Sequence, residues 1–560
     1  MSIISSAATG ATVLIGSSVI GRAITFISNV IVARTVGRAA LGIGALRLDE
    51  VMYLGPLQLV REGLRKVSYR GKTANEKQTL VNLAWISMPI GIIIALCIAF
   101  LLLQNPPKSV NVEDDIDPNV YLRSIAYTFI AVVIAFLHEP MFLLASSDMK
   151  QGLRARIQVA AQFGKSFVLI MLLVLFVNQN WGIEAFALAN IGYALTLFLG
   201  YFIHYYNETI DISLLPKQLS SVESSSSSSR GMWYEKYFDT SISTTIIVFW
   251  MQAIQKWLLE NGEKLILVFL GTSEDAGEYM LVAGLGSIVA RILFQPIEEM
   301  SLAAFSKLEK NEDKQNNRKN AGKEQQLQQS KSSIYNLIRT LTLSMSLGGL
   351  MFTAFGPAFS HLLLNILYGS KWSSTNAPFL LGVYCLYILT MALNGVLEAF
   401  VLGVGKSEQL KQYNYWMFAF SIAFLSSVFI LIPYGIVGLI MANIVKMICR
   451  IFVCLVFYLK PYMMENNITI TNVDGTTRNF QLNDLFPKLP VFIVFAISFV
   501  MTQISSKFIY QNEIRIISFN SIGHLVIGML FFLFTSFVCW KYHGVELKAA
   551  FVAGRKKKEE

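Results

Sequence analysis

Arginine side chains inside apolar stretches are the residues of this sequence best placed to do chemistry. The most informative stretch, GLGSIVARILFQPIEE at 284–299, places Arg291 within an apolar window from Ala276 to Phe305. An arginine at the centre of a bilayer costs about 2.5–3.5 kcal/mol on insertion scales. Such a charge is tolerated where it faces a partner or a polar cavity, so Arg291 marks a candidate functional site.

Other cations occur at similar depth or at the ends of apolar stretches. They are Arg22, Arg34, Arg47, Arg61, Arg65, Lys264, Lys446 and Arg450. The carboxylates in or near the same stretches are Asp49, Glu50, Glu139, Glu263, Glu298, Glu299 and Glu398. For each cation, an ion pair that locks two helices is the simplest alternative to a functional role. Arg34, Arg61 and Arg65 could instead extend to the membrane interface as anchors.

The functional interpretation of these arginines is an anion site. Arginine suits a diphosphate because its planar guanidinium donates two parallel hydrogen bonds and keeps its charge. The stretch 11–33 carries Arg22 but no carboxylate, which favours an anion over the proton or sodium ion of a coupled exporter. We predict that Arg22, Arg34, Arg47, Arg61, Arg65, Arg291 and Arg450 bind substrate. The predicted charge partners or gating residues are Glu263, Lys264, Glu298, Glu299, Glu398 and Asn443.

The elements that must position these side chains are membrane helices. Of the 560 residues, 54% are hydrophobic and 15% are charged, whereas soluble domains carry about 25% charge. A membrane-spanning helix needs about 20 apolar residues, and the sequence predicts an all-α polytopic membrane protein with about fourteen spans. The expected spans are 11–33, 41–60, 80–103, 122–146, 157–177, 182–204, 241–270, 275–303, 334–366, 376–402, 412–432, 435–459, 488–509 and 518–540.

The expected spans group as six, six and two. The predicted parts are an N-lobe at 1–204, a cytosolic linker at 205–240, a C-lobe at 241–459 with a cytosolic insert at 304–333, a cytosolic loop at 460–487, two helices at 488–540 and a basic tail at 541–560. The serine run Ser224–Ser229 and the polar segment 311–331 indicate flexible linkers. The prolines of Gly55-Pro56, Glu139-Pro140 and Gln295-Pro296 predict kinks in their helices. These kinks could serve as bending points during transport, or the prolines could simply be tolerated in membrane helices.

The distribution of lysine and arginine predicts the orientation in the membrane. Cations gather in the loops 61–77, 147–156 and 304–333 and in the tail 555–558, which places both termini in the cytosol. The net charge of +10 is spread over these loops, so nucleic-acid binding is not expected. The sequons at Asn207 and Asn467 lie on the predicted cytosolic side, where no glycan is added.

No motif in the sequence indicates an enzyme, a cofactor or a metal. The tripeptides Gly71-Lys72-Thr73 and Gly405-Lys406-Ser407 lack the earlier glycine of a P-loop, and His138-Glu139 lacks a second histidine at the zinc spacing. The five cysteines form no CxxC pair. An acidic loop at 113–117 could bind a cation for a glycosyltransferase, but the loops on that side are too short for such an enzyme.

Several short motifs resemble those of the eukaryotic Rft family. They are Arg22-Ala23-Ile24-Thr25-Phe26 with Asn29 and Arg34, Arg61-Glu62 with Arg65, Asn261-Gly262-Glu263-Lys264, the stretch 284–299, Asn394-Gly395 with Glu398, and Gly438, Ala442-Asn443 and Arg450. The family belongs to a wider superfamily of polysaccharide and lipid flippases that includes MurJ and MATE transporters. The resemblance implies fourteen helices in two MurJ/MATE-like lobes, residence in the endoplasmic reticulum membrane, and association with a dolichol-diphosphate heptasaccharide.

Three functional hypotheses follow. The first is translocation of that dolichol-linked oligosaccharide for N-glycosylation, by alternating access without ATP, with Arg22, Arg47, Arg291 and Arg450 neutralising the diphosphate. The second is a binding or chaperone protein that does not transport the same lipid. The third is an ion-coupled exporter of small molecules. The expected partners are the dolichol-diphosphate lipid and lipids of the endoplasmic reticulum membrane, and we expect a monomer.

Overall fold

The chain folds into helices that separate into two compact units. The computed structural model describes residues 21–68, 73–108, 116–175, 182–206, 212–219, 237–238, 240–316, 323–465, 469–471, 477–479, 482–511, 515 and 518–556. Unit 1 is Met1–Leu281 and unit 2 is Val282–Glu560. Nearly all of the described residues are helical, and two three-residue strands pair as a hairpin. The predicted all-α class is therefore confirmed.

Ten helices in the described part of the chain are long and apolar enough to cross a membrane. One of them, Glu408–Glu465, contains two predicted spans joined by a tight turn at Ile432–Tyr434. The predicted spans 41–60 and 241–270 are also helical, although they are not among the ten. Of the predicted span 11–33, residues 21–33 are described and helical. The total of fourteen spans stays a prediction.

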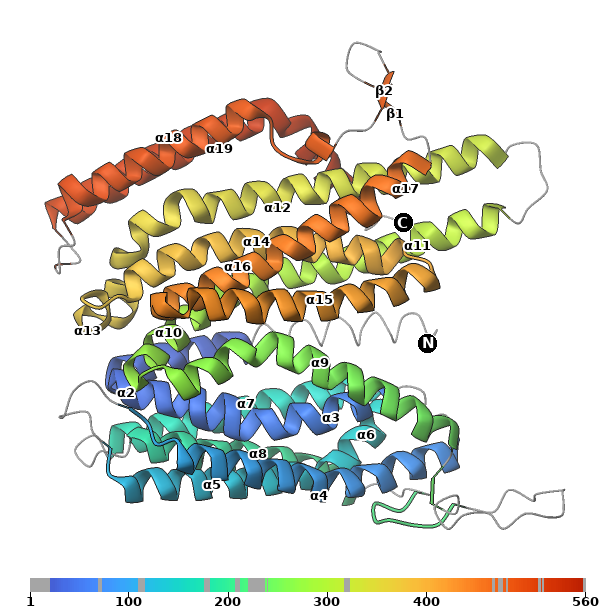
Figure 1. The fold of residues 1–560 in the computed structure, drawn as a ribbon, viewed down its shortest axis with the longest axis vertical. Coiled ribbons are helices and arrows are strands. Elements are labelled where there is room, and N and C mark those ends of the chain that lie inside the picture. The colour runs from blue at the N-terminus through green and yellow to red at the C-terminus, as the bar shows by residue number, and fades with distance from the viewer. Residues whose placement is uncertain are drawn as a thin grey trace. The chain divides into compact units, whose positions relative to one another are not determined.

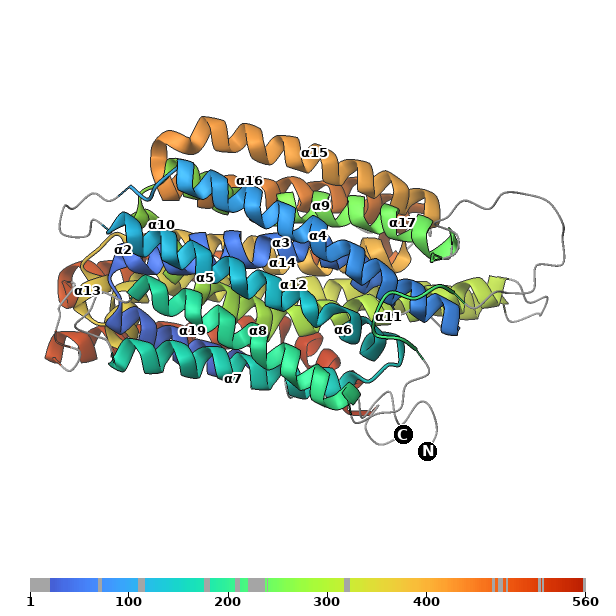
Figure 2. The ribbon, with the colours of Figure 1, turned by 90° about the horizontal axis from the view of Figure 1, so that it is seen from below.

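Unit 1 is a bundle of helices (Figures 1 and 2). Its elements are a helix at 21–35, α2 (Arg38–Leu41), the π-helix η1 (Gly42–Leu54), α3 (Gly55–Ser68), α4 (Ala74–Gln104), α5 (Pro118–Leu137), α6 (Glu139–Ser147), α7 (Gln151–Leu175), α8 (Gly182–Tyr206) and α9 (Thr240–Leu270). Helix α8 packs between α5 and α7, and α3 packs against α4 and α9. α9, which the sequence analysis assigned to the C-lobe, thus groups with unit 1.

Local sequence signals begin and break the helices of unit 1. Thr73 and Glu76 form a capping box that satisfies backbone N–H groups at the start of α4. The dipeptide Glu139-Pro140 ends α5, because proline has no N–H for the helix ladder and its ring clashes with the preceding turn. The chain turns at His138 and restarts as α6, so Glu139 lies in the first turn of a new helix.

Unit 2 has a long-helix core with a terminal helix pair. After α10 (Ser273–Val289), which crosses from unit 1, its elements are η5 (Ala290–Phe294), α11 (Gln295–Asn316), α12 (Lys323–Tyr368), α13 (Ser370–Ser373), α14 (Ala377–Val404), α15 (Ser407–Leu431), η6 (Ile432–Tyr434), α16 (Gly435–Val453), η7 (Cys454–Leu459), α17 (Lys460–Glu465), β1 (Thr469–Thr471), β2 (Thr477–Asn479), η8 (Leu482–Leu485), α18 (Leu489–Ser505), η9 (Ser506–Tyr510) and α19 (Phe519–Lys556). Helix α14 packs against α11, α12 and α16.

Helices α18 and α19 lie side by side along α12 (Figure 1). A polar seam joins them inside an otherwise apolar surface. Ser498 and Thr535 share a hydrogen bond of 2.7 Å, and His524 contacts Ser505 at 2.8 Å and the carbonyl of Ala358 at 3.2 Å. Large apolar side chains on the other faces of both helices are exposed, as expected of helices that contact lipid.

Two predicted linkers contain ordered structure. The insert predicted at 304–333 continues α11 to Asn316 and begins α12 at Lys323, because its Glu, Gln and Lys residues are good helix formers. In the linker predicted at 205–240, residues 212–219 lie against α4, held by side chains of that helix. The serine run itself lies outside the described residues.

Candidate functional site

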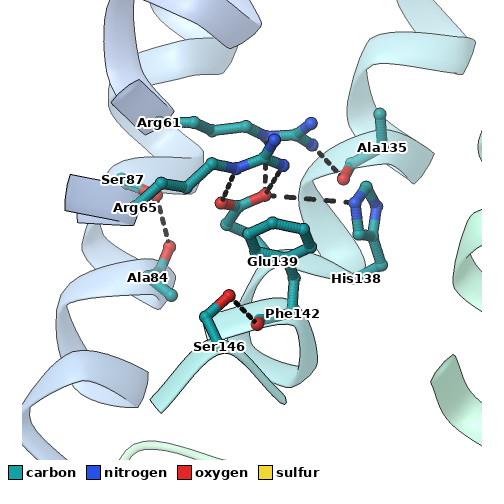
Figure 3. A network of polar contacts seen from close by, with 9 residues as sticks. All are labelled: Arg61, Arg65, Ala84, Ser87, Ala135, His138, Glu139, Phe142 and Ser146. Carbon is teal, nitrogen blue, oxygen red and sulfur yellow. Dashed lines mark hydrogen bonds and ion pairs between the residues drawn. The ribbon is translucent and has the colours of Figure 1, made fainter. Parts of the chain in front are cut away.

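Two arginines of α3 converge on one carboxylate of α6 (Figure 3). Arg61 and Arg65 are four residues apart, so they project from the same face of their helix. Arg65 binds Glu139 with a two-pronged fork, from Nε to Oε1 at 2.8 Å and from Nη2 to Oε2 at 2.7 Å. The Nε of Arg61 lies 2.9 Å from Oε2 of the same carboxylate. Arg61 also donates to the carbonyl of Ala135 near the end of α5.

Burial differs sharply within this cluster. The side chain of Glu139 is 0% exposed, that of Arg61 8% and that of Arg65 36%. The guanidinium carbon of Arg61 lies 4.9 Å from the ring centre of Phe136, and that of Arg65 lies 4.0 Å from the ring centre of Phe142. Cation–π contacts and the positive end of the α6 dipole near Glu139 add to the stabilisation. Two cations facing one carboxylate leave the trio with one positive charge.

Arg47 lies elsewhere in unit 1 and is bound by backbone. It is buried in η1 and donates to the carbonyl of Asn105 at 2.6 Å, to the carbonyl of Val268 at 2.8 Å and to the hydroxyl of Tyr121 at 3.3 Å. Asn105 ends α4 and Val268 lies in the last turn of α9. The last carbonyls of a helix lack intrahelical partners, so a cation that binds them caps both helix ends.

Two neighbouring acids of η1 are each held by a lysine from another helix. Lys165 lies 2.7 Å from Oδ2 of Asp49, whose Oδ1 accepts from Asn190 at 2.7 Å. Lys264 lies 2.8 Å from Glu50. The remaining predicted gating residue of unit 1, Glu263, is buried and accepts from the hydroxyl of Tyr279 at 2.5 Å.

In unit 2, Arg450 of α16 pairs with Glu398 of α14. Its Nη2 lies 2.5 Å from Oε2 of Glu398, which also accepts from Asn394 at 3.0 Å. Lys446, one turn before Arg450, is buried with its ammonium 4.6 Å from the ring centre of Phe424. Asn443 is buried on the same helix and donates to the carbonyl of Leu439 at 3.3 Å.

The stretch 284–299 contains a change of helix type. Arg291 lies in the π-helix η5 with an exposed side chain. Glu299 is exposed and accepts from Gln295 at 2.9 Å, whereas Glu298 lies close to Gly395 of α14. At the start of the chain, Arg22 is half-buried and Arg34 is exposed within the helix 21–35.

The structure brings some of the predicted residues together and separates others. In unit 1, Arg61 and Arg65 share a carboxylate, whereas Arg47 binds two helix ends. In unit 2, Arg450 and Asn394 share the carboxylate of Glu398. The shared cavity for arginines from both lobes stays a prediction. Glu139 was noted in the sequence as a membrane carboxylate but was not assigned to the site. Its Glu-Pro helix break, read together with two arginines at i, i+4 spacing, is the signal that could have assigned it.

The sequence matches the family described as "Rft protein" over residues 6–550. The chain belongs to the Rft protein family. The resemblance inferred from the motifs is therefore confirmed, and it covers nearly the whole of this Rft protein.

Curated relatives of this Rft protein cover most of its length. A protein of Dictyostelium discoideum named "Man(5)GlcNAc(2)-PP-dolichol translocation protein RFT1" is 29% identical, over 96% of this chain and 95% of that protein. A Mus musculus protein of the same name is 31% identical, over 77% of this chain and 78% of that protein.

Solved structures with the same fold are transporters of lipids and drugs. The lipid II flippase MurJ in an inward closed conformation superposes with a TM-score of 0.55 at 13% identity, over 94% of this chain and 98% of MurJ. An inward-facing multidrug resistance MATE transporter of the MOP superfamily gives a TM-score of 0.53 at 11% identity, over 80% of this chain and 98% of that one. The Rft protein therefore has the MurJ/MATE fold, as predicted.

Proposed function

We propose that this Rft protein moves a dolichol-diphosphate oligosaccharide, with five mannoses and two N-acetylglucosamines, across the endoplasmic reticulum membrane for N-glycosylation. The observation that carries the proposal is the match of nearly the whole chain to relatives named for translocation of Man(5)GlcNAc(2)-PP-dolichol. The fold, shared with a lipid flippase, supports it. The protein works as a transporter without a cofactor, as a monomer with both termini in the cytosol.

The diphosphate of the lipid would be bound by accessible arginines. Arg65 and Arg291 are the strongest candidates, because the side chain of Arg65 is 36% exposed and Arg291 is exposed. Arg22 and Arg34 of the first helix extend the proposed site. Arg47 and Arg450, which bind protein groups, would hold helices in place around the ligand. The glycan and diphosphate would cross the membrane through the protein while the dolichol chain stays in lipid.

The proposed energy source is consumption of the lipid on the far side of the membrane. A coupling ion is disfavoured, because the acids Asp49 and Glu50 of η1 are already neutralised by Lys165 and Lys264. The carboxylate of Asp49 is partly buried and holds the ammonium of Lys165 at 2.7 Å, so its counter-charge is supplied by the protein. This arrangement supports the lipid transporter over the ion-coupled exporter.

A second candidate function is lipid binding without transport, as a chaperone for the same oligosaccharide. The same arginines would bind the diphosphate in either case, and the names of the relatives refer to translocation rather than to binding. The two functions differ only in whether lipid crosses the bilayer when the protein is present.

Reconstitution of the purified protein in liposomes with labelled dolichol-linked oligosaccharide tests the proposal. We expect the protein to accelerate transbilayer movement, and Arg65→Gln and Arg291→Gln to slow it by about ten-fold each, the loss of one charge-assisted bond. Arg123→Gln is the matched control, since Arg123 is an exposed helix arginine whose partner is Glu184. Binding without acceleration favours the chaperone, and equal rates in all variants contradict the arginine site.

A further inference from the structure

Glu139 occupies the place that a phosphate would take on Arg65. The fork from Nε and Nη2 of Arg65 to the two carboxylate oxygens, at 2.8 Å and 2.7 Å, is the geometry in which a guanidinium binds two oxygens of a phosphate. A carboxylate and a phosphate therefore compete for the same donors. Figure 3 shows that the Arg65 guanidinium meets the carboxylate of Glu139 through the edge that carries Nε and Nη2.

The two arginines of the cluster are not equivalent. Arg61 is buried, contacts Glu139 through Nε at 2.9 Å and donates to the carbonyl of Ala135. Its two contacts come from separate elements, the end of α5 and the start of α6, and both would have to break for it to leave. Arg65 has a side chain that is 36% exposed, and both of its hydrogen bonds go to Glu139.

Because two arginines face one carboxylate, Arg65 can leave Glu139 for another anion without leaving the buried carboxylate unpaired. If Arg65 turns to another anion, Glu139 keeps the Arg61 contact and remains paired. Loss of the only partner would instead leave a buried charge, which is strongly unfavourable. The trio with its single positive charge becomes neutral when one further negative charge binds.

We propose that Glu139 is a positioning residue that holds Arg65 in readiness and releases it to the diphosphate of the lipid, while Arg61 stays with Glu139. This inference rests on the proposed function and deepens it, since it assigns the counter-ion that the ligand displaces. In the unliganded protein Glu139 fixes the guanidinium and suppresses its binding to other anions. Removal of the carboxylate charge therefore strengthens diphosphate binding instead of weakening it.

The test measures binding of a water-soluble isoprenyl diphosphate to the full-length protein in detergent. The wild type is compared with Glu139→Gln, Arg65→Gln and the double variant. We expect Glu139→Gln to bind about ten-fold more tightly, because Arg65 no longer has to leave a charged partner. Arg65→Gln binds at least ten-fold more weakly, and adding Glu139→Gln to it gives no gain. If Glu139 and Arg65 form a purely structural ion pair, Glu139→Gln should instead weaken binding of the diphosphate.

Two further variants keep the test decisive. Glu139→Gln leaves Arg61 without its counter-charge, so Arg61→Gln with Glu139→Gln removes both charges and frees Arg65 in a fold without an unpaired ion. It should also bind more tightly than the wild type. Glu184→Gln is the matched control, since it neutralises another buried carboxylate of unit 1 that pairs with an arginine. Its affinity should equal that of the wild type.

The outcomes separate this inference from the proposed function. Unchanged or weaker binding in Glu139→Gln and in Arg61→Gln with Glu139→Gln, with a wild type that binds the probe, overturns the exchange alone. No binding of the probe to any variant contradicts the proposed function as well. A parallel titration with inorganic pyrophosphate distinguishes the sources of the anion: equal affinity for it would contradict a lipid ligand.

Discussion

Arg47 of η1 and Arg65 of α3 lie in consecutive helical segments and have different surroundings. Arg47 is buried, and its donors satisfy the backbone carbonyls of Asn105 and Val268 at the ends of two helices. Arg65 is partly exposed, and its donors satisfy a carboxylate. Backbone carbonyls carry no charge that a ligand could replace, whereas a carboxylate can be exchanged for a phosphate. Of these two arginines, only Arg65 is therefore suited to a ligand.

The pair of Arg450 and Glu398 allows a prediction about stability. Both side chains are mostly buried and lie 2.5 Å apart. Glu398→Gln leaves the guanidinium without its counter-charge, so we expect the free energy of unfolding to fall by about 3–5 kcal/mol. The double variant Glu398→Leu with Arg450→Met should recover most of this loss, because apolar side chains remove the unpaired charge. Denaturant unfolding in detergent measures both values.

The exposed acid Glu299 is the control for this pair. It is exposed and accepts a hydrogen bond from Gln295 of the same helix, so Glu299→Gln should leave the denaturation midpoint unchanged. A loss of stability in Glu398→Gln no larger than in Glu299→Gln would contradict a structural role for the Arg450 pair.

At the scale of elements, π-helix segments precede three of the prolines. Segment η1 ends two residues before Pro56, η5 two residues before Pro296 and η7 two residues before Pro461. A proline ring clashes with the carbonyl four residues earlier in an α-helix. In each case that carbonyl belongs to a π segment, whose wider turn relieves the clash. The second predicted span of each half has this feature, and the six-plus-six arrangement itself stays a prediction.

Residues 212–219 form a strap that is held across α4 by side-chain amides. Gln78 accepts from the N–H of Ser213 at 3.1 Å, and Asn82 accepts from the N–H of Lys217 at 3.0 Å. The Nδ2 of Asn82 donates to the carbonyls of Lys217 and Tyr237, both at 2.8 Å. The indole of Trp85 adds a bond of 2.8 Å to the carbonyl of Leu214.

Loss of the Asn82 amide should therefore loosen the strap at a defined position. In Asn82→Leu the N–H of Lys217 loses its acceptor, and we expect its hydrogen exchange to accelerate about ten-fold, as for one lost hydrogen bond. Hydrogen–deuterium exchange of the peptide that contains Lys217 measures this. Trp85→Phe is the control, since it leaves both amide acceptors in place. Equal exchange in the two variants would show that the strap is held by other contacts.

The sequence predicts the helices well and their polar contacts poorly. An apolar run of about 20 residues predicts a membrane helix even when its first and last residues are uncertain by a few positions. Most of the expected spans therefore coincide with helices. The Glu139 cluster depends on which helix meets the buried face of α3, and the sequence of α3 defines that face without naming α6 as its partner. The strap was missed because Gln78 and Asn82 bind backbone groups, which have no signature in the sequence of the partner segment.

For the whole molecule, α9 is the element whose position matters most. Four polar contacts among the described residues join it to the preceding helices of unit 1. They are Trp250 to the carbonyl of Leu59 at 2.6 Å, Lys256 to Glu62 at 3.6 Å, Lys264 to Glu50 at 2.8 Å, and Arg47 to the carbonyl of Val268 at 2.8 Å. They are spread from the first half of α9 to its last turn. We infer that α9 moves with unit 1, and the predicted start of the C-lobe at 241 stays a prediction.

Transbilayer movement of the lipid, counted per vesicle, tests the central claim of transport most directly. Purified protein is reconstituted at increasing protein-to-vesicle ratios with labelled dolichol-linked oligosaccharide, and a membrane-impermeant lectin or enzyme reports the accessible lipid. If the protein transports the lipid, a single copy in a vesicle makes the labelled lipid of both leaflets accessible to the reagent. The accessible fraction of lipid then rises with the fraction of vesicles that contain protein. The contradicting result is a protein that binds the lipid, while the accessible fraction of labelled lipid stays equal to the fraction in the outer leaflet at every protein-to-vesicle ratio.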